Sequence, residues 1–357
     1  MLKAREAVRN LKEYHPPLGN RQGLRLDFNE NTVGCSPRVL QRLRSITGED
    51  LARYPEREPS EKVVAAHLGL DPKEVILTNG TDEAIHLICE TYLEPGHEAI
   101  IGVPTFAMYE IYAAATGVRV IAAQAGENLG FPAEKILEQM NERTRLIAVA
   151  NPNNPTGALA SQEDLLQIAE AAPRAAILVD EAYFEFCGET MMPRWRDVPN
   201  LFVSRTFSKA YGLAGLRIGV LTGNVEHMRM VRRASSPYNL NGVALACLPE
   251  ALADQDFITN YVDEAIGGRV RLEAELKARG IKYWPSKANF VLMYFGDSNL
   301  AFISAMRERG ILVRDRSGDA GCKGCVRITL GSAEHNERLL KEFSEVLNQM
   351  PTLLGAR

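Results

Sequence analysis

Seven short apolar runs alternate with helix-like segments between Glu74 and Leu221, and this alternation constrains the fold more than any other feature. Each run is apolar almost throughout, so it predicts a strand that is buried on both faces. The intervening segments, such as 82–92 and 162–171, have helical periodicity and N-cap residues. Such an order predicts an α/β fold with a mostly parallel central sheet sandwiched by helices. The expected strands are Val75–Leu77, Ala99–Ile101, Val118–Ile121, Leu146–Val149, Ala176–Val179, Leu201–Val203 and Ile218–Leu221.

The alternation of apolar runs and helical segments ends after Asn241. A long helical segment is expected at 257–279, and strands are expected at 289–294 and 326–330, with helices between and after them. This order predicts a second, smaller α+β domain. We therefore expect three parts: an N-terminal arm with part of the small domain at 1–45, a large cofactor-binding domain at 46–245, and a small C-terminal domain at 246–357.

The composition is that of an ordinary globular protein. Hydrophobic residues make up 46% and charged residues 24% of the 357 positions. The net charge of −4 gives no basic surface for nucleic acid or an anionic membrane. No apolar run approaches the roughly 20 residues of a membrane span, and residues 1–20 contain no apolar signal segment. We expect a cytoplasmic protein with neither nucleic acid nor membrane as a partner.

The six cysteines are scattered through the chain, which argues against a disulfide scaffold. Cys322 and Cys325 form a C-x-x-C, but neither a second pair nor a nearby histidine completes a tetrahedral set. No metal site is therefore predicted.

Lys209 has unusual neighbours for a lysine. It follows the expected strand 201–203 and stands among Ser, Thr, Gly, Ala and aromatic residues within Ser204–Arg217. Burial there disfavours the ammonium form and lowers the pKa, which makes the amine a nucleophile towards carbonyl groups. Arg217, eight residues on, offers a planar cation suited to phosphate. A solvated loop lysine is the ordinary alternative, and the surrounding sequence argues against it.

Three further polar segments follow expected strands, at the edge where open α/β sheets hold ligands. Thr78–Glu83 begins a helix, so its backbone N–H groups and Gly80 offer an anion site. Asn151–Gly157 has two prolines bracketing asparagines, which fixes a rigid turn. Asp180 ends a strand that reads as fully buried, and a carboxylate there needs a partner.

The pattern Ser-x-x-Phe-Ser-Lys-x-x-Gly-Leu-x-Gly-Leu-Arg at Ser204–Arg217 closely resembles the cofactor-lysine segment of class I/II, fold type I pyridoxal-phosphate (PLP) aminotransferases. Asn151–Gly157 and Asp180–Tyr183 are similar to further motifs of that family, in the family's order, and the similarity runs from Val8 to Thr329. Among these enzymes the chain looks most like the histidinol-phosphate aminotransferases. The resemblance implies a fold type I architecture, pyridoxal 5'-phosphate as cofactor, and a homodimer with shared active sites.

The resemblance implies roles for five residues at the cofactor ring. Lys209 holds PLP covalently and moves the proton during transamination, and Asp180 keeps the ring nitrogen protonated, so that the ring withdraws electrons. Asn154 and Tyr183 hydrogen-bond the phenolate oxygen. Phe106 stacks on the ring, and the alternative for Phe106 is an ordinary core position.

The resemblance also places the cofactor phosphate in a cup of backbone N–H groups, hydroxyls and one arginine. Tyr54 reaches it from the neighbouring subunit, because a residue before proline is forced into an extended conformation and projects. For Asp82 a simple helix cap is the alternative. The expected phosphate contacts are Gly80, Thr81, Asp82, Thr206, Ser208, Arg217 and Tyr54.

An arginine lies within the apolar C-terminal strand. The resemblance makes this residue, Arg327, the clamp for the anionic group of the substrate, with Arg314, Asn154 and Tyr14 as further substrate contacts. An ion pair with Asp315 or a solvated position is the alternative for Arg314.

Asn29–Asn31 resembles the family's Asn-Glu-Asn motif. Thr32–Cys35 follows it where Pro-x-Gly-Pro is commoner, so the loop departs from the usual pattern. An ordinary polar turn is the alternative.

The resemblance implies a transaminase of histidine biosynthesis. It would convert L-histidinol phosphate and 2-oxoglutarate to imidazole acetol phosphate and L-glutamate. An aromatic aminotransferase or a threonine-phosphate decarboxylase shares almost every cofactor residue, so both stay open as alternatives. A non-catalytic binding protein is disfavoured because it would not need Lys209, Asp180 and Asn154 together. A nicotinamide dehydrogenase is disfavoured because no G-x-G-x-x-G follows a strand.

Overall fold

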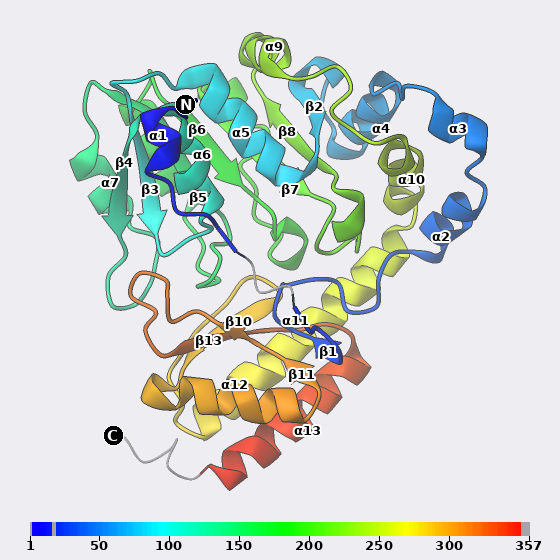
Figure 1. The fold of residues 1–357 in the computed structure, drawn as a ribbon, viewed down its shortest axis with the longest axis vertical. Coiled ribbons are helices and arrows are strands. Elements are labelled where there is room, and N and C mark those ends of the chain that lie inside the picture. The colour runs from blue at the N-terminus through cyan, green and yellow to red at the C-terminus, as the bar shows by residue number, and fades with distance from the viewer. Residues whose placement is uncertain (1, 16–18, 351–357) are drawn as a thin grey trace.

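A seven-stranded sheet forms the centre of the larger part of the molecule, in the upper half of Figure 1. The computed structural model describes residues 2–15 and 19–350. The strand order is β2-β8-β7-β6-β5-β3-β4, and only β8 runs antiparallel to its neighbours. The strands are β2 (Val75–Thr78), β3 (Glu98–Val103), β4 (Arg119–Gln124), β5 (Thr144–Ala150), β6 (Ala176–Asp180), β7 (Leu201–Thr206) and β8 (Gly219–Gly223).

The apolar runs of the sequence account for this sheet. Every residue of β2, β6, β7 and β8 is buried, as strands covered on both faces should be. β4 lies at an edge of the sheet and is partly exposed. All seven expected strands are present, with Val118 and Ile218 just outside their strands. The predicted fold class, an α/β fold with a mostly parallel sheet, is confirmed.

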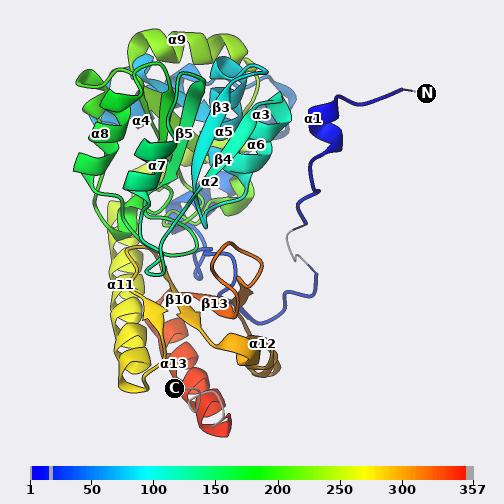
Figure 2. The ribbon, with the colours of Figure 1, turned by 90° about the vertical axis from the view of Figure 1, so that its left-hand side faces the viewer.

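Helices cover both faces of this sheet, as Figures 1 and 2 show. On one face, α5 packs through Ile85 and Ile88 together with α6 and α9. On the other face, Ile136 of α7 and Leu165 of α8 contribute to the core, and this layer continues near β2 with α4 and α10. The helices are α4 (Glu58–Leu68), α5 (Gly80–Tyr92), α6 (Met108–Thr116), α7 (Ala133–Gln139), α8 (Gln162–Ala171), α9 (Val225–Ala234) and α10 (Gly242–Leu252).

A smaller part with an antiparallel sheet lies below the first one in Figure 1. Its strand order is β12-β13-β10-β9. The long helix α11 joins the two parts, and Phe302 of α12 and Phe343 of α13 help to fill the smaller core. The elements are α11 (Gln255–Ala278), β9 (Tyr283–Trp284), β10 (Phe290–Tyr294), α12 (Asn299–Glu308), β12 (Arg314–Asp315), β13 (Cys325–Thr329) and α13 (Ala333–Gln349).

The N-terminal segment contacts both parts. Its helix α1 (Glu6–Arg9) lies near α6, where Arg5 Nη2 donates a hydrogen bond to Ala115 O at 3.0 Å (Figure 2). Further on, β1 (Leu24–Arg25) pairs with β11 (Ile311–Leu312) of the smaller part. The chain then returns to the larger part through α2 (Pro37–Arg44), which packs against α10, and α3 (Gly48–Ala52). The domain boundary expected after residue 245 falls within α10, and the division into domains stays a prediction.

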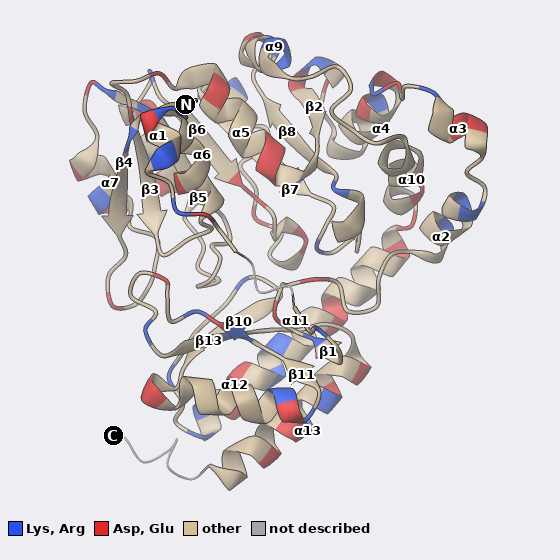
Figure 3. Ribbon diagram, viewed as in Figure 1, with Lys and Arg blue, Asp and Glu red and all other residues tan. Residues whose placement is uncertain are grey.

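Charges of both signs are distributed over both parts of the molecule. In Figure 3, basic and acidic residues are interspersed on the helices. Such a mixture creates no extended field of one sign on the face shown. Within the described ranges, no helix combines the length and the apolar character that crossing a membrane requires.

Candidate active site

A cavity of about 240 Å³ opens where strands of the large sheet end. β5 ends at Ala150, β6 at Asp180 and β7 at Thr206, and all three residues line the cavity. They meet there because the carboxyl ends of parallel strands share one edge of a sheet. The other lining residues are Phe28, Glu30, Thr81, Asp82, Phe106, Tyr109, Pro152, Asn154, Ala182, Tyr183, Ser208, Lys209, Ala214 and Arg217.

The carboxylate of Asp180 is buried and has one oxygen free for a ligand. Its Oδ2 accepts a hydrogen bond from Tyr109 Oη at 2.7 Å. Its Oδ1 has no hydrogen-bond partner within the described residues. Burial raises the pKa of Asp180 to about 6, although the Tyr109 hydrogen bond opposes this shift. A cationic donor at Oδ1 would restore the ionised state and satisfy the buried oxygen.

Lys209 has the environment that its sequence neighbours predicted. Its Nζ donates a hydrogen bond to Phe28 O at 2.9 Å. Burial lowers the pKa of Lys209 to about 8, and the charge of Arg327 acts in the same direction, while Glu30 opposes it. About one tenth of such an amine is neutral at pH 7, against far less than a hundredth for an ordinary lysine.

A chain of hydrogen bonds orients Tyr183 from the smaller part of the molecule. Thr329 Oγ1 donates to Asn29 Oδ1 at 3.0 Å, and Asn29 Nδ2 donates to Tyr183 Oη at 2.8 Å. The Tyr183 hydroxyl therefore already accepts one hydrogen bond, and its own proton is left to donate into the cavity. Burial raises the pKa of Tyr183, which keeps the hydroxyl protonated.

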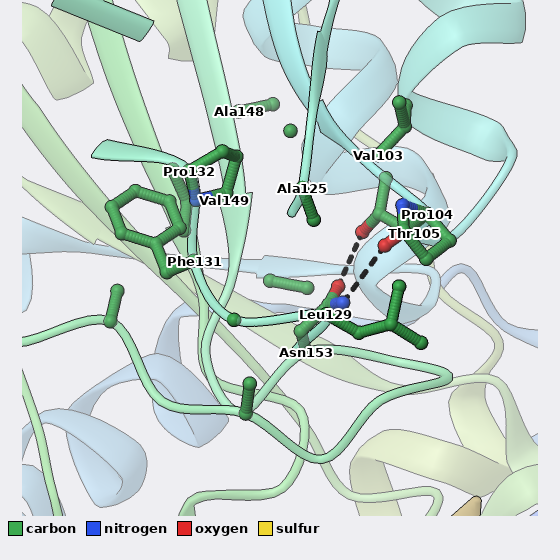
Figure 4. Close-up of a pocket in the computed structure, with 15 residues that line it drawn as sticks. Val103, Pro104, Thr105, Ala125, Leu129, Phe131, Pro132, Ala148, Val149 and Asn153 are labelled. Atoms are coloured by element: carbon green, nitrogen blue, oxygen red, sulfur yellow. Dashed lines mark hydrogen bonds between the residues drawn. The ribbon is translucent and has the colours of Figure 1, made fainter. Parts of the chain in front are cut away.

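The turn Asn151–Gly157 holds Asn154 at the cavity. Asn153 fastens this turn: its Oδ1 accepts from Thr105 Oγ1 at 2.7 Å and its Nδ2 donates to Pro104 O at 2.9 Å (Figure 4). These bonds border a separate small cavity of about 20 Å³. Asn154 Oδ1 accepts from Arg327 Nη1, so the amide nitrogen of Asn154 is the donor that remains for a ligand.

The N-terminus of α5 and Arg217 together offer the groups that an anion site needs. The first backbone N–H groups of a helix have no intrahelical acceptor. Gly80 has φ 75°, and a Cβ there would lie 2.7 Å from Arg217 Nη2, so glycine lets the guanidinium lie over the helix start. Arg217 Nη2 pairs with Asp82 Oδ2 at 3.0 Å. The Asp82 carboxylate is therefore engaged, which leaves its backbone N–H as the group suited to an anion. Thr81, Thr206 and Ser208 complete the predicted cup.

Two arginines lie side by side next to the cavity. Arg314 of β12 and Arg327 of β13 are directly opposite in an antiparallel ladder, which places their side chains on one face. Arg327 Nη2 donates to Asp27 O at 2.6 Å, and burial lowers the pKa of Arg327 to about 9. Within the described residues neither arginine forms an ion pair. The ion pair considered above between Arg314 and Asp315 is therefore not formed. Two such cations with spare donors favour an anionic ligand.

Five predicted site residues do not line this cavity: Gly80, Arg314 and Arg327 adjoin residues that do, whereas Tyr54 and Tyr14 lie elsewhere. Tyr54 is 78% exposed, and its ring lies 4.5 Å from that of Tyr238. Tyr14 is 44% exposed and lines a different pocket, together with residues of α1 and α6. Their contacts with cofactor and substrate stay predictions.

The residues present fit PLP. Asp180 Oδ1 is a buried acceptor without a partner, which suits a protonated pyridine nitrogen. Lys209 supplies a buried amine for the aldehyde, and the anion site at Gly80 and Arg217 suits a phosphate. Phe106 lines the same cavity, edge-on to Tyr109 at 5.9 Å, and offers an aromatic face.

Sequence reasoning missed three contributors to this site. Tyr109 lies in the first turn of α6, three residues after Phe106, and its closeness in sequence to a predicted cofactor contact was the available signal. Thr329 lies two residues after Arg327 on one strand, and so on the same face. Asn29 belongs to a motif that the sequence singled out without a role. None of these signals reveals the long-range partner of each residue.

Comparison with known proteins agrees with this geometry. Residues 21–343 match the family Aminotransferase class I and II. The histidinol-phosphate aminotransferase of Caldanaerobacter subterraneus subsp. tengcongensis is 36% identical over 329 residues, covering 91% of this chain and 93% of that protein. That of a Geobacillus species is 36% identical over 352 residues, covering 96% of this chain and 94% of that protein.

A solved structure extends the agreement to three dimensions. The crystal structure of histidinol-phosphate aminotransferase from Sinorhizobium meliloti in complex with pyridoxal-5'-phosphate matches with a TM-score of 0.87 and 25% sequence identity. The match covers 98% of this chain and 99% of that chain. This chain therefore belongs to the class I and II aminotransferases and groups with the histidinol-phosphate aminotransferases among them.

Proposed function

We propose that this protein transfers the amino group of L-histidinol phosphate to 2-oxoglutarate in histidine biosynthesis. The relatives that cover nearly the whole chain at 33–36% identity support this assignment. The observation that carries it is the pair Arg314 and Arg327, two cations without an anionic partner in the described residues, beside a cavity that holds Lys209 and Asp180. Such a pair suits a donor whose anionic group is a phosphate.

Asp180 and Lys209 have separate roles in the transamination. PLP, the cofactor of this family, supplies an electron sink when bound. The Asp180 carboxylate would hold the ring nitrogen in its protonated state, with its unpartnered Oδ1 as the acceptor, while Tyr109 fixes Oδ2. Lys209 offers a neutral amine at a pH near its pKa of about 8 and carries the proton that leaves the substrate carbon.

Asn154 and Tyr183 serve the phenolate side of the cofactor. Asn154 is oriented by Arg327 so that its amide nitrogen is free to donate. Tyr183 is oriented by Asn29 so that its hydroxyl proton is free. Two donors towards one phenolate oxygen stabilise its negative charge. The α5 N-terminus, Thr206, Ser208 and Arg217 would hold the phosphate.

Arg327 binds the anionic group of both substrates. Glutamate and 2-oxoglutarate present an α-carboxylate, whereas histidinol phosphate presents a phosphate on the neighbouring carbon. A planar guanidinium accepts either anion in a bidentate arrangement. Arg314 on the adjacent strand adds a second positive charge for the more highly charged phosphate.

We further propose a homodimer with shared active sites in the cytoplasm. Tyr54 acts on the partner's cofactor phosphate, and its 78% exposure leaves it free to do so. Exposed apolar side chains nearby in sequence, Leu51 at 65% and Val63 at 40%, favour a covered surface in this region. All six cysteines are free, which fits a reducing compartment.

The test is a donor panel with 2-oxoglutarate as acceptor. L-Histidinol phosphate, L-histidinol, phenylalanine and threonine phosphate are compared by kcat/KM, with carbon dioxide release measured alongside. We expect histidinol phosphate to give the highest kcat/KM, glutamate as product, and no carbon dioxide. A clear preference for phenylalanine, or carbon dioxide release from threonine phosphate, would assign the site to one of the two alternative activities.

A further inference from the structure

Glu30 is a carboxylate of the active-site cavity to which the proposed reaction gives no role. It shares the lining of the cavity with two other carboxylates, Asp82 and Asp180. Asp82 is paired with Arg217, and Asp180 is committed to Tyr109 and the ring nitrogen. Glu30 is therefore the lining carboxylate that remains for the substrate.

Glu30 is held from one side only. Its Oε2 accepts a hydrogen bond from Arg21 Nη2 at 2.9 Å and lies 3.5 Å from Arg25 Nε. Its Oε1 takes part in no hydrogen bond within the described residues, and the side chain is 24% exposed. Two arginines on one oxygen orient the carboxylate, and the other oxygen stays available as an acceptor.

Glu30 and Lys209 line the same cavity and interact electrostatically. Arg21, which holds Glu30, stacks 4.1 Å from the centre of the Phe28 ring. The carbonyl oxygen of Phe28 in turn accepts the hydrogen bond from Lys209 Nζ. The charge of Glu30 acts on the pKa of Lys209 and raises it against the stronger effect of burial. A donor whose amino group reaches Lys209 thus has its side chain in the same cavity as Glu30.

We propose that Glu30 is a specificity-determining residue that accepts a hydrogen bond from the ring N–H of an imidazole-bearing amino donor. The inference rests on the proposed function, because it takes histidinol phosphate as the donor. Neutral imidazole carries one N–H donor and imidazolium carries two. A hydrogen bond to a carboxylate is roughly twice as strong as one between neutral groups.

The same carboxylate selects against donors without a ring N–H. A phenyl ring in this position would leave Glu30 Oε1 partly desolvated and without a hydrogen-bond donor, and an acceptor left without a donor disfavours such analogues. One residue therefore both favours imidazole donors and disfavours aromatic ones.

The test compares Glu30→Gln with the wild-type holoenzyme on three substrates: histidinol phosphate, phenylalaninol phosphate and glutamate. Phenylalaninol phosphate keeps the phosphate and a flat ring but lacks the ring N–H. We expect kcat/KM for histidinol phosphate to fall about 10- to 100-fold, mainly through KM, as loss of a charge-assisted hydrogen bond does. We expect kcat/KM for phenylalaninol phosphate to stay level or rise, and the glutamate half-reaction to change by less than about threefold.

Glu163→Gln is the matched control, because it removes one negative charge from an exposed position in the first turn of α8. It should leave all three values as in the wild type. Equal losses on all three substrates in Glu30→Gln would mean that Glu30 only supports the fold, and the inference would fail.

If Glu30→Gln does not fold, measurements on the wild-type enzyme still test the role of Glu30. A wild-type ratio of kcat/KM near one between histidinol phosphate and phenylalaninol phosphate would also overturn the inference. If the wild type does not transaminate histidinol phosphate at all, the proposed function itself fails. If it does so while the ratio is the same in Glu30→Gln, only the role of Glu30 fails.

Discussion

The active-site cavity has two walls that are built in different ways. The cofactor wall comes from the large sheet, the segment between β7 and β8, and α5, and consists of Thr81, Asp180, Thr206, Ser208, Lys209 and Arg217. The substrate wall consists of Phe28 and Glu30, which line the cavity, and of Asp27, Asn29, Arg314 and Arg327 behind them, and it joins the N-terminal segment to the small sheet. Its hydrogen bonds connect residues 300 positions apart, such as Asp27 with Arg327 and Asn29 with Thr329.

This difference suggests a division of labour. The cofactor wall is set by the ends of parallel strands, so its geometry follows from one buried sheet. The substrate wall depends on three chain segments coming together, and it contains the cations that we propose bind the substrate anion. A substitution in the cofactor wall should therefore affect every substrate alike, whereas one in the substrate wall should affect substrates to different extents.

The largest effect is expected from Lys209→Ala in the cofactor wall. Removal of the amine should lower transamination of every donor by several orders of magnitude, because a covalent catalyst and a proton carrier are lost together. The variant should still bind PLP through the phosphate site at α5 and Arg217. Cofactor titration by absorbance, with steady-state turnover on histidinol phosphate and glutamate, checks both parts. A loss confined to one substrate would contradict the division between the walls.

Asp180→Asn should lower turnover by about 10²–10⁴-fold, the range that a positioned charge or proton partner contributes. A neutral amide no longer favours the protonated ring nitrogen. Single-turnover rates of both half-reactions measure this effect, and they should fall together. Tyr109→Phe should lower turnover less, because it leaves the carboxylate in place and removes only the hydrogen bond to Oδ2. Wild-type turnover in Asp180→Asn would exclude Asp180 as the ring-nitrogen partner.

Arg327→Lys in the substrate wall should lower kcat/KM about 100-fold, because a bidentate clamp becomes a point charge. Both half-reactions should suffer, and histidinol phosphate more than glutamate, since a phosphate carries more charge than a carboxylate. The same two single-turnover rates check this. Equal losses in kcat/KM for histidinol phosphate and glutamate would contradict the predicted difference between the two walls.

Tyr54→Phe should weaken cofactor binding by about 1.5–3 kcal/mol if the hydroxyl bonds the phosphate of the partner subunit. Equilibrium dialysis of PLP measures this change. Heterodimers assembled from a Lys209→Ala chain and a Tyr54→Ala chain should regain some intact sites. Verified heterodimers without recovered activity, or a monomeric active enzyme, would rule out the contribution in trans.

The smallest effect concerns pH. Only neutral Lys209 reacts with the cofactor aldehyde, so capture of PLP by the cofactor-free protein should rise about tenfold from pH 7 to 9 and then level off. The capture rate should level off above pH 9 because the pKa of Lys209 is about 8.

The same shift predicts a trend in folding stability. Between about pH 8 and the ordinary lysine pKa of 10.5, the unfolded chain binds more protons at Lys209 than the folded protein does. The free energy of unfolding should therefore rise with pH in this range, and it should rise less in Lys209→Met. Stopped-flow absorbance and denaturant unfolding measure the two trends. A capture rate that still rises steeply above pH 9 would show an unperturbed lysine.

The cofactor wall could be predicted from sequence because its residues come directly after apolar strands. Lys209, Asp180 and Asn154 each stand in a short segment whose strand could be recognised, and strand ends meet by a general rule. The pairing of Arg217 with Asp82 was not predicted, because it depends on how the guanidinium lies over Gly80.

The substrate wall was only partly predictable for a physical reason. Arg327 stood out as a cation in an apolar strand, but its contact with Asp27 spans 300 residues, and no local pattern encodes it. The same holds for the hydrogen bonds from Thr329 through Asn29 to Tyr183. Tyr54 and Tyr14 stay predictions, since neither reaches the cavity within one chain.

The most direct test of this account is the identity of the lysine that bonds the cofactor. The holoenzyme is reduced with borohydride, digested and mapped by mass spectrometry, with Lys209→Ala as the control. We predict one modified peptide, with the cofactor mass on Lys209, and no modified peptide from the variant. A cofactor on any other lysine of the wild-type enzyme would contradict the placement of the active site at the ends of β5, β6 and β7.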